Sequence, residues 1–313
     1  MSECLTLSQP PLVHAKTIEE TITELVPNPD LASHAKSDPC LIAGEIDRFF
    51  SQHPNCQALF LPRLEWQALQ SDAPWLSLFL GDRLTRSQFY QLPALGIRHT
   101  PSDRFPPELI QSVDSAGLHP KRPPTPKGYV YERFDPVSGL HISFRVFDPK
   151  TDMARFTKWM NTPRVAHFWE QAWPEERLHE FILERLADPH ILPLIGEFDG
   201  EPFGYVEAYW ASEDRLSPYY DAQPYDRGIH LLVGEESYRG SRHFNTWMRA
   251  MTHYLFQDDC RTQRIVLEPR HDNERLFNRI QEVGYTKQFE FNFPHKRSAL
   301  LMTTRYAFFR EQW

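Results

Sequence analysis

The chain has 313 residues and a formal net charge of −8 at pH 7, which argues against generic binding to nucleic acid because that requires a basic surface. Hydrophobic residues make up 41% and charged residues 24% of the chain, so we expect a globular protein with a sizeable core. With roughly 150 residues per domain as a guide, this length predicts two domains.

The four cysteines are scattered and form no CxxC pair, so the sequence predicts neither a zinc ribbon nor a dense disulfide framework. No signal peptide is recognisable, and no apolar run reaches the ~20 residues of a membrane helix. We therefore expect a soluble cytoplasmic protein with reduced thiols, with neither a membrane nor a nucleic acid as partner. No feature of the sequence indicates an oligomeric state.

The first half of the chain contains no chemical motif. Apolar spacing predicts a short helix at residues 42–50, a buried strand at residues 57–61 and a helical turn at residues 65–69. We expect these elements to belong to an accessory α+β domain.

Residues 119–128 (HPKRPPTPKG) concentrate prolines, which propagate neither a helix nor a central strand ladder. This segment is therefore expected to be a linker. The predicted domains are residues 1–122 and residues 129–313.

The second half shows a denser pattern. A strand is predicted at residues 141–146, and amphipathic helices are predicted at residues 152–160 and 175–186. The apolar runs that follow, within residues 192–210, are separated by Asp199-Gly200, a dipeptide that favours a hairpin turn.

Residues 225–240 couple an apolar strand to an Arg-Gly turn that opens an amphipathic helix. The apolar face of this helix consists of Phe244, Trp247, Met248, Met251, Tyr254 and Leu255. The first amides of a helix lack internal partners and lie at its positive end, so the turn can present N–H groups to a pyrophosphate while the strand edge holds a thioester. This arrangement is typical of an acyl-coenzyme A site.

A strand at residues 264–268, a helix at residues 273–282 that ends at Gly284, and a final pair of strands complete the pattern. The succession of strands and helices indicates a mixed α/β (α+β) fold.

The second half contains seven distinctive motifs: His167-Phe168-Trp169-Glu170-Gln171, Tyr209-Trp210, Glu213-Asp214-Arg215, Tyr225-Asp226-Arg227-Gly228-Ile229-His230, Arg261-Thr262-Gln263-Arg264, Glu268-Pro269-Arg270 and Phe293-Pro294-His295-Lys296-Arg297. These motifs resemble those of the GNAT acyltransferase family, and more closely its siderophore-biosynthesis branch. The resemblance covers residues 129–313 and implies a GNAT fold with a central mixed sheet. A weaker similarity in the first half implies a smaller, degenerate GNAT-like domain there.

The resemblance implies transfer of an acetyl group from acetyl-CoA, as co-substrate, to the terminal hydroxylamine nitrogen of N6-hydroxylysine. The product is a hydroxamate, an iron(III) ligand of aerobactin-type siderophores, and the transfer needs no metal. A lysine N-hydroxylase and a citrate-condensing synthetase are the implied pathway neighbours. Two alternatives stay open: the same fold acting on another hydroxylated amine, such as hydroxyornithine or hydroxycadaverine, or on another acyl-CoA, and a non-catalytic acyl-CoA-binding module.

The siderophore branch places its proposed catalytic histidine in a Gly-x-His element, which matches Gly228-Ile229-His230. A neutral imidazole with a pKa near ~6.5 could accept the proton released as the hydroxylamine attacks. The orienting acid is expected to be Glu268 or Asp272, because adjacent parallel strands bring their C-terminal ends together. A hydrogen-bonded core histidine, a strand-capping Glu268 and a helix-capping Asp272 are the structural alternatives.

The resemblance places the thioester oxyanion on backbone amides along Leu231, Leu232 and Val233. The predicted cofactor-binding residues beyond this strand are Arg239, Gly240, Ser241, Arg242 and Asn273.

Two elements depart from the GNAT pattern, the pyrophosphate turn and the helix after Glu268. The family's pyrophosphate turn reads R-x-x-G-x-G/A, whereas Arg242 and Phe244 fill the two small positions here, and Arg242 could contact a phosphate directly. Ile280 stands where many members have a tyrosine that protonates the leaving thiolate. The thiolate must therefore find another acid or leave as the anion.

The acceptor-binding candidates are aromatic or charged. An aromatic wall of His167, Trp169 and Trp173 could cover the aliphatic chain, and Tyr209 and Trp210 are further candidates. The α-amino group could be bound by Glu207, Asp214 or Asp226, and the α-carboxylate by Arg270, Lys296 or Arg297. Aromatic stripes more often belong to a core, and charged loops usually belong to a solvated surface.

Overall fold

The computed structural model describes residues 11–36, 40–111 and 117–311. The described residues divide into two compact units, the first made of those up to Gly96 with Phe134–Leu140, and the second of those within Ile97–Arg133 and from His141 onward. The proline-rich residues 119–128 lie within the second unit. The domain boundary expected at this segment stays a prediction, as does the GNAT-like origin of the first unit.

The first unit contains a small mixed sheet in the order β1-β2-β3-β4. Its strands are β1 (Val13–Glu19), β2 (Ile22–Pro27), β3 (Ala58–Phe60) and β4 (Arg83–Thr85), and its helices are α1 (Pro29–Ala35), α2 (Leu41–Gln52), α3 (Arg63–Trp66) and α4 (Arg86–Tyr90). The predicted helix, strand and helical turn of this half are confirmed as α2, as β3, and as α3 with the short 3₁₀ helix that follows it.

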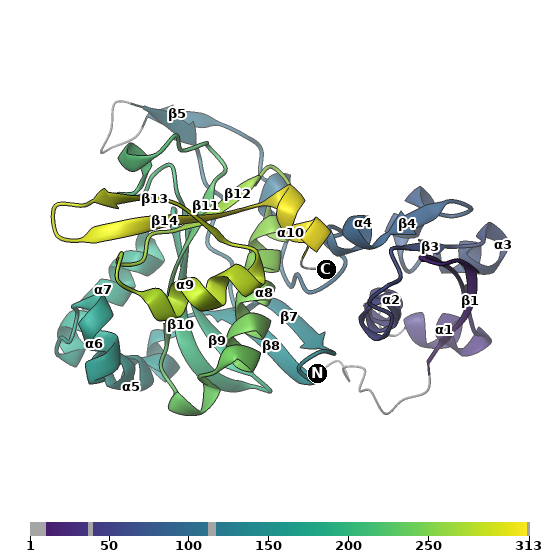
Figure 1. Cartoon of the computed structure of the whole chain (residues 1–313), viewed down its shortest axis with the longest axis horizontal. Coiled ribbons are helices and arrows are strands. Elements are labelled where there is room, and N and C mark those ends of the chain that lie inside the picture. Colours follow the sequence, from purple (N-terminus) through teal and green to yellow (C-terminus); the bar gives the residue numbers. More distant parts are fainter. Residues whose placement is uncertain (1–10, 37–39, 112–116, 312–313) are drawn as a thin grey trace. The chain divides into compact units, whose positions relative to one another are not determined.

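The larger sheet has, among the described residues, eight strands in the order β13-β14-β12-β11-β10-β9-β8-β7 (Figure 1). These strands are β7 (Tyr129–Asp135), β8 (Leu140–Val146), β9 (Ile191–Phe198), β10 (Glu201–Trp210), β11 (Arg227–Val233), β12 (Arg264–Leu267), β13 (Thr286–Asn292) and β14 (Arg297–Thr304). β11 and β12 are parallel, whereas β9, β10 and β11 pair antiparallel in sequence order. The predicted mixed α/β fold is confirmed.

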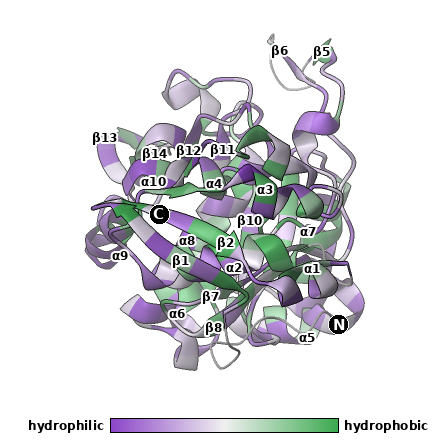
Figure 2. Cartoon of the chain, turned by 90° about the vertical axis from the view of Figure 1, so that its right-hand side faces the viewer, coloured by the Kyte–Doolittle hydropathy of each residue, from purple (hydrophilic) through white to green (hydrophobic). Residues whose placement is uncertain are grey.

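The helices of the second unit are α5 (Pro149–Met160), α6 (Pro163–Trp169), α7 (Glu175–Ala187), α8 (Ser241–Asp258), α9 (Glu274–Ile280) and α10 (Arg305–Glu311). Helices α5, α6 and α7 lie together, and α8 lies beside α9 (Figure 1). The short hairpin of β5 (Leu109–Gln111) and β6 (Leu118–Pro120) extends away from the rest of this unit (Figure 2).

The core of the second unit joins helices α5, α6 and α7 to the sheet. Buried Phe156 and Trp159 of α5 pack in one cluster with Tyr205 of β10 and Leu232 of β11. A Cβ atom at Gly234 would lie 2.1 Å from the Trp159 ring, so only glycine fits against this indole. Burial of these large side chains removes apolar area from water and holds α5 against β10 and β11.

Turn chemistry behaves as expected in this unit. Asp199 and Gly200 both have positive φ angles, 50° and 81°, and join β9 to β10 as the predicted hairpin. Gly284, with φ of 82°, terminates the helical segment that begins at Glu274. No helix in the described part of the chain is long and apolar enough to span a membrane.

Strands β11 and β12 diverge after a short parallel contact. Arg227 pairs with Ile265 and Gly228 with Val266, and no further pair joins these two strands in the described residues. Beyond this contact the strands diverge. Side chains of β11 after Gly228 therefore face side chains at the end of β12 across an open space. Ligand sites of α/β sheets commonly lie at such carboxyl ends.

Candidate active site

A cavity of about 550 Å³ opens where β11 and β12 diverge. Many of the predicted site residues line it: Trp169, Glu207, Asp214, His230, Leu231, Leu232, Val233, Arg239, Gly240, Glu268, Arg270, Asn273 and Lys296. The fold therefore brings most of the predicted site residues, which span more than a hundred positions of the chain, into one cavity.

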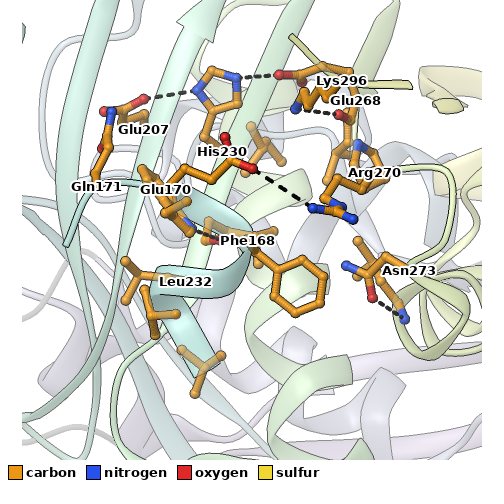
Figure 3. A pocket seen from close by; sticks show the side chains of 18 of the residues that line it. Phe168, Glu170, Gln171, Glu207, His230, Leu232, Glu268, Arg270, Asn273 and Lys296 are labelled. Carbon is orange, nitrogen blue, oxygen red and sulfur yellow. Dashed lines mark hydrogen bonds and ion pairs between the residues drawn. The ribbon is translucent and has the colours of Figure 1, made fainter. Parts of the chain in front are cut away.

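His230 lies between two buried carboxylates (Figure 3). Its Nδ1 is 2.9 Å from Oε2 of Glu207, and its Nε2 is 2.8 Å from Oε1 of Glu268. Glu207 and His230 are directly opposite each other across the β10–β11 ladder, and Glu268 immediately follows β12. We call this group, Glu207–His230–Glu268, the carboxylate–imidazole triad.

Two tyrosines hold the outer oxygens of the triad. Tyr205 donates a hydrogen bond of 3.0 Å to Oε1 of Glu207, and Tyr209 donates one of 2.9 Å to Oε2 of Glu268. The Tyr209 ring also lies 4.5 Å from the His230 ring, and a Cβ atom at Gly228 would come within 2.0 Å of this phenol. Gly228 therefore gives Tyr209 the space to reach Glu268.

The triad favours a positively charged histidine. An ionised carboxylate accepts hydrogen bonds only, so two carboxylates at the two ring nitrogens require both nitrogens to carry a proton. Burial by itself would lower the pKa of His230, but Glu268 and Glu207 outweigh burial and raise it to about 10. Burial likewise opposes ionisation of Glu207 and Glu268, yet His230 lowers the pKa of both carboxyls.

This finding differs from the expectation of a neutral imidazole with an ordinary pKa. In the triad His230 has no free lone pair with which to accept a proton. The sequence did not indicate a charged His230 because the register that puts Glu207 of β10 opposite His230 of β11 could not be predicted. Of the two acids proposed as partners, Glu268 contacts His230, whereas Asp272 is exposed and pairs with Arg270 at 2.9 Å.

One end of the cavity is rich in arginine. Arg239 follows β11, Arg164 belongs to α6, and Arg275 and Arg279 lie one turn apart on α9; all four line the cavity. The charges of Arg239, Arg279 and Arg164 lower the pKa of Arg275, which indicates that the arginines lie close together. Glu236 offsets part of this charge, because it pairs with Arg164 at 2.8 Å and with Arg239 at 2.6 Å. Only Arg239 was predicted here, although the four-residue spacing on α9 would have indicated a common face.

Helix α8 begins beside this cationic end, as the sequence predicted. Gly240 caps the helix with a φ of 136°, a conformation that favours glycine, and Ser241 is the first helical residue. Ser241 and Arg242 are exposed and do not line the cavity. Asn273 lines it and also caps α9, since its side chain accepts the Leu276 N–H at 3.3 Å.

Helix α6 supplies the aromatic wall. Trp169 donates its indole N–H to the carbonyl of Leu231 at 3.3 Å, and Phe168 also lines the cavity. His167 is exposed and lies outside the lining. Glu170, which ends the helix in the left-handed conformation with φ of 57°, faces Arg270 at 3.8 Å (Figure 3).

Three predicted acceptor contacts serve the scaffold in this structure. Tyr209 supports Glu268, as described. Trp210 makes cation–π contacts with the guanidinium groups of Arg122 and Arg227, which lie 4.1 and 3.9 Å from the ring centroid. Asp226 is almost fully buried and accepts hydrogen bonds from Arg264, so it fixes the approach to β11 rather than lining the cavity. No cluster of three metal-ligating side chains occurs among the residues that the structure describes.

Comparisons with known proteins identify the family. Residues 148–293 match the model of the acetyltransferase (GNAT) domain. The chain is 43% identical over 266 residues to the N(6)-hydroxylysine O-acetyltransferase of Escherichia coli, covering 85% of this chain and 84% of that protein. It is 38% identical over 232 residues to the N(5)-hydroxyornithine:cis-anhydromevalonyl coenzyme A-N(5)-transacylase SIDF of Beauveria bassiana, covering 67% of this chain and 50% of that protein.

Solved structures agree with this assignment. The aminoglycoside acetyltransferase AAC(6')-Ib in complex with ribostamycin and coenzyme A superposes with a TM-score of 0.50 and 25% identity, over 55% of this chain and 98% of that chain. The resemblance to the GNAT family that the motifs indicated is thereby confirmed. The chain belongs to the GNAT acetyltransferase family and is an acyltransferase.

Proposed function

We propose that this enzyme transfers the acetyl group of acetyl-CoA to the hydroxylamine nitrogen of N6-hydroxylysine and so forms a hydroxamate for an aerobactin-type siderophore. The observation that carries the proposal is the carboxylate–imidazole triad at the centre of a cavity with one cationic end. Similarity to the E. coli N(6)-hydroxylysine O-acetyltransferase supports the choice of acceptor.

The cationic end suits coenzyme A. The phosphates of this donor are anionic, and arginine binds phosphate oxygens through several N–H groups at once. Arg164, Arg239, Arg275 and Arg279 offer such groups, and the positive end of the α8 helix dipole begins beside them at Gly240. We therefore assign the pyrophosphate to this end, where the arginines take over from the small residues that are missing from the GNAT turn.

The triad suits a nucleophile that is already neutral. A lysine ammonium, with a pKa near ~10.4, must lose a proton before it can attack. A protonated His230 cannot accept that proton, and Glu207 and Glu268, whose pKa values His230 lowers, are too weakly basic to take it from an ammonium. An alkyl hydroxylamine is largely unprotonated near neutral pH. The protonation state of the triad therefore favours a hydroxylamine acceptor over an amine.

The proposed step moves one proton from nitrogen to sulfur. The hydroxylamine nitrogen bonds to the thioester carbon, the carbonyl becomes an oxyanion, and the nitrogen becomes cationic, so that its now acidic proton passes to the Glu268 carboxylate. The oxyanion is held by the amide of Leu231; in an extended strand this N–H lies on the same edge as the Leu231 carbonyl, which the Trp169 indole binds. As the C–S bond breaks, His230 protonates the thiolate and then recovers a proton from Glu268, a route that needs no tyrosine at Ile280.

A substrate panel tests the proposal. Purified enzyme receives acetyl-CoA with hydroxylysine, hydroxyornithine, hydroxycadaverine or lysine, and the release of CoA thiol and the ferric hydroxamate colour are recorded together. Hydroxylysine is expected to react fastest, and lysine at least about 100-fold more slowly, because only about one lysine amine in a thousand is neutral at pH 7.4. Absence of hydroxamate from every acceptor would contradict the proposal.

The second candidate is hydroxyornithine with a different acyl donor, which the similarity to the Beauveria transacylase favours. A panel of acyl-CoA thioesters, read by product mass, separates it from the first. Calorimetric binding of CoA without turnover of any acceptor would instead indicate a non-catalytic acyl-CoA-binding module.

The reaction chemistry also suggests the cellular setting. The acceptor must come from a lysine N-hydroxylase, and the hydroxamate would next be condensed with citrate by a synthetase, so we place the enzyme in the cytoplasm with these two activities. Fractionation of cells, followed by activity measurements on each fraction, tests this placement.

A further inference from the structure

Near the triad, the charged side chains of Asp214 and Lys296 have no ion-pair partner within 4 Å among the described residues, a property that they share with Arg275 and Arg279 at the cationic end. The other acidic groups of the lining are matched: Glu213 pairs with Arg122, and Arg185 reaches Glu207. Arg270 of the lining is matched as well, by Asp272.

Asp214 lies in the loop after β10 and is anchored by the Leu216 N–H, which donates to its Oδ1 at 2.9 Å. Its other carboxylate oxygen has no hydrogen bond in the described structure. Burial raises the pKa of Asp214, while the charges of His230 and Arg215 act in the opposite direction without contacting it. A cation bound in the cavity could contact the free oxygen directly.

Lys296 lies in the turn between β13 and β14, and its Nζ donates to the main-chain carbonyl of Glu268 at 3.2 Å. An ammonium carries three N–H groups, so two remain for a ligand. Burial lowers the pKa of Lys296, while the negative charges of Glu268 and Asp214 act in the opposite direction. Asp214 and Lys296 therefore lie within electrostatic range of each other without touching.

We infer that Asp214 and Lys296 bind the α-ammonium and the α-carboxylate of the acceptor and so select an α-amino acid. This inference rests on the proposed function. An unpaired charge in a partly buried cavity is costly, and a zwitterion with one group of each sign is the ligand that compensates both. The head group is thereby held at the edge of the cavity while its side chain extends toward the triad.

The consequence is a specific kind of selectivity. Hydroxycadaverine lacks the carboxylate and 6-(hydroxyamino)hexanoate lacks the ammonium, yet both keep the hydroxylamine and the alkyl chain. Each analogue leaves one protein charge unmatched. We expect kcat/KM to fall about 10- to 100-fold for each, a range typical of removing one member of a partly buried charge pair.

The test pairs each variant with the analogue that lacks the matching group. Asp214→Asn should lower kcat/KM for hydroxylysine about 10- to 100-fold and leave that for 6-(hydroxyamino)hexanoate within about threefold. Lys296→Met should likewise lower kcat/KM for hydroxylysine about 10- to 100-fold and leave that for hydroxycadaverine within about threefold. The retained turnover of the matched analogue also shows that the loss of the Lys296 bond to Glu268 has not disabled the triad. Asp221→Asn and Lys287→Met, exposed and outside the lining, are the control variants.

The outcomes are separable. Wild-type enzyme that acetylates all three acceptors equally well would overturn this inference and leave the proposed function intact. Equal losses for hydroxylysine and the matched analogue would also overturn it. Failure of the wild-type enzyme with every hydroxylamine would instead remove the proposed function itself.

Discussion

Substitution of Glu207 by glutamine changes one charge of the triad and keeps its shape. Wild-type His230 has a pKa of about 10 because two carboxylates contact it. An opposite charge at this range raises a histidine pKa by about 1–3 units, so removal of one carboxylate should bring His230 to between about 7 and 9. At about 1.4 kcal/mol per pKa unit, the imidazolium loses roughly 1–4 kcal/mol of stabilisation.

The assay is the pH dependence of kcat with hydroxylysine, supported by imidazole nitrogen NMR of His230. If His230 protonates the thiolate, activity falls when His230 loses its proton, so the alkaline limb of Glu207→Gln should move to lower pH by about 1–3 units. Glu201→Gln makes the same change at an exposed position of β10 and should leave the profile unmoved.

Two results would refute this reasoning. An unchanged alkaline limb of the pH profile, together with an unchanged His230 titration, would mean that Glu207 does not raise the pKa of His230. A variant that becomes more active near pH 8, because more His230 is neutral, means that His230 works as a base, the role that the sequence alone suggested.

Three further predictions concern the donor end, the scaffold and the stability of the fold. Arg275→Ala with Arg279→Ala should raise KM for acetyl-CoA about tenfold and weaken its salt dependence, whereas an unchanged KM, equal to that of the exposed Arg310→Ala control, would exclude these arginines from the phosphate site. Gly228→Ala should displace Tyr209 from Glu268 and lower both the melting temperature and kcat, so an unaltered melting temperature would argue against the close approach. The raised pKa of His230 stabilises the fold fully below the unfolded pKa near 6.5, and this stabilisation is lost as pH rises toward about 10. The lowered pKa values of Glu207 and Glu268 stabilise the fold above about pH 4.5. The free energy of unfolding of the wild type in urea should therefore exceed that of His230→Gln by the largest amount between about pH 5 and 6.5. A pH-independent difference would contradict the ion-paired triad.

Local rules predicted most of the secondary structure. The Asp199-Gly200 turn, the helix stop at Gly284 and the apolar face of α8 each depend on a few neighbouring residues, and each is confirmed. Helix α6 was not predicted as a helix although its motif was noted, because its seven residues are too short for a periodic pattern.

The site was harder to predict because it depends on register and on pairing between distant segments. The pairing of His230 with the end of β12 follows from parallel strands, and Glu268 was a candidate for that reason. Glu207 lies opposite His230 only in the observed β10–β11 register, and a slip of one residue would turn its side chain to the other face. Similarly, the four arginines converge from α6, the β11–α8 turn and α9, and no single segment reveals them as a group.

The bond formed in the reaction is the most direct test of the central claim. Enzyme is incubated with acetyl-CoA labelled with ¹³C at the carbonyl and with hydroxylysine labelled with ¹⁵N at the hydroxylamine, and early product is examined by NMR. We predict a one-bond coupling between the two labels, as in a hydroxamate. A product that carries the acetyl carbon without this coupling, an O-acetyl hydroxylamine, or no labelled product at all would contradict the account.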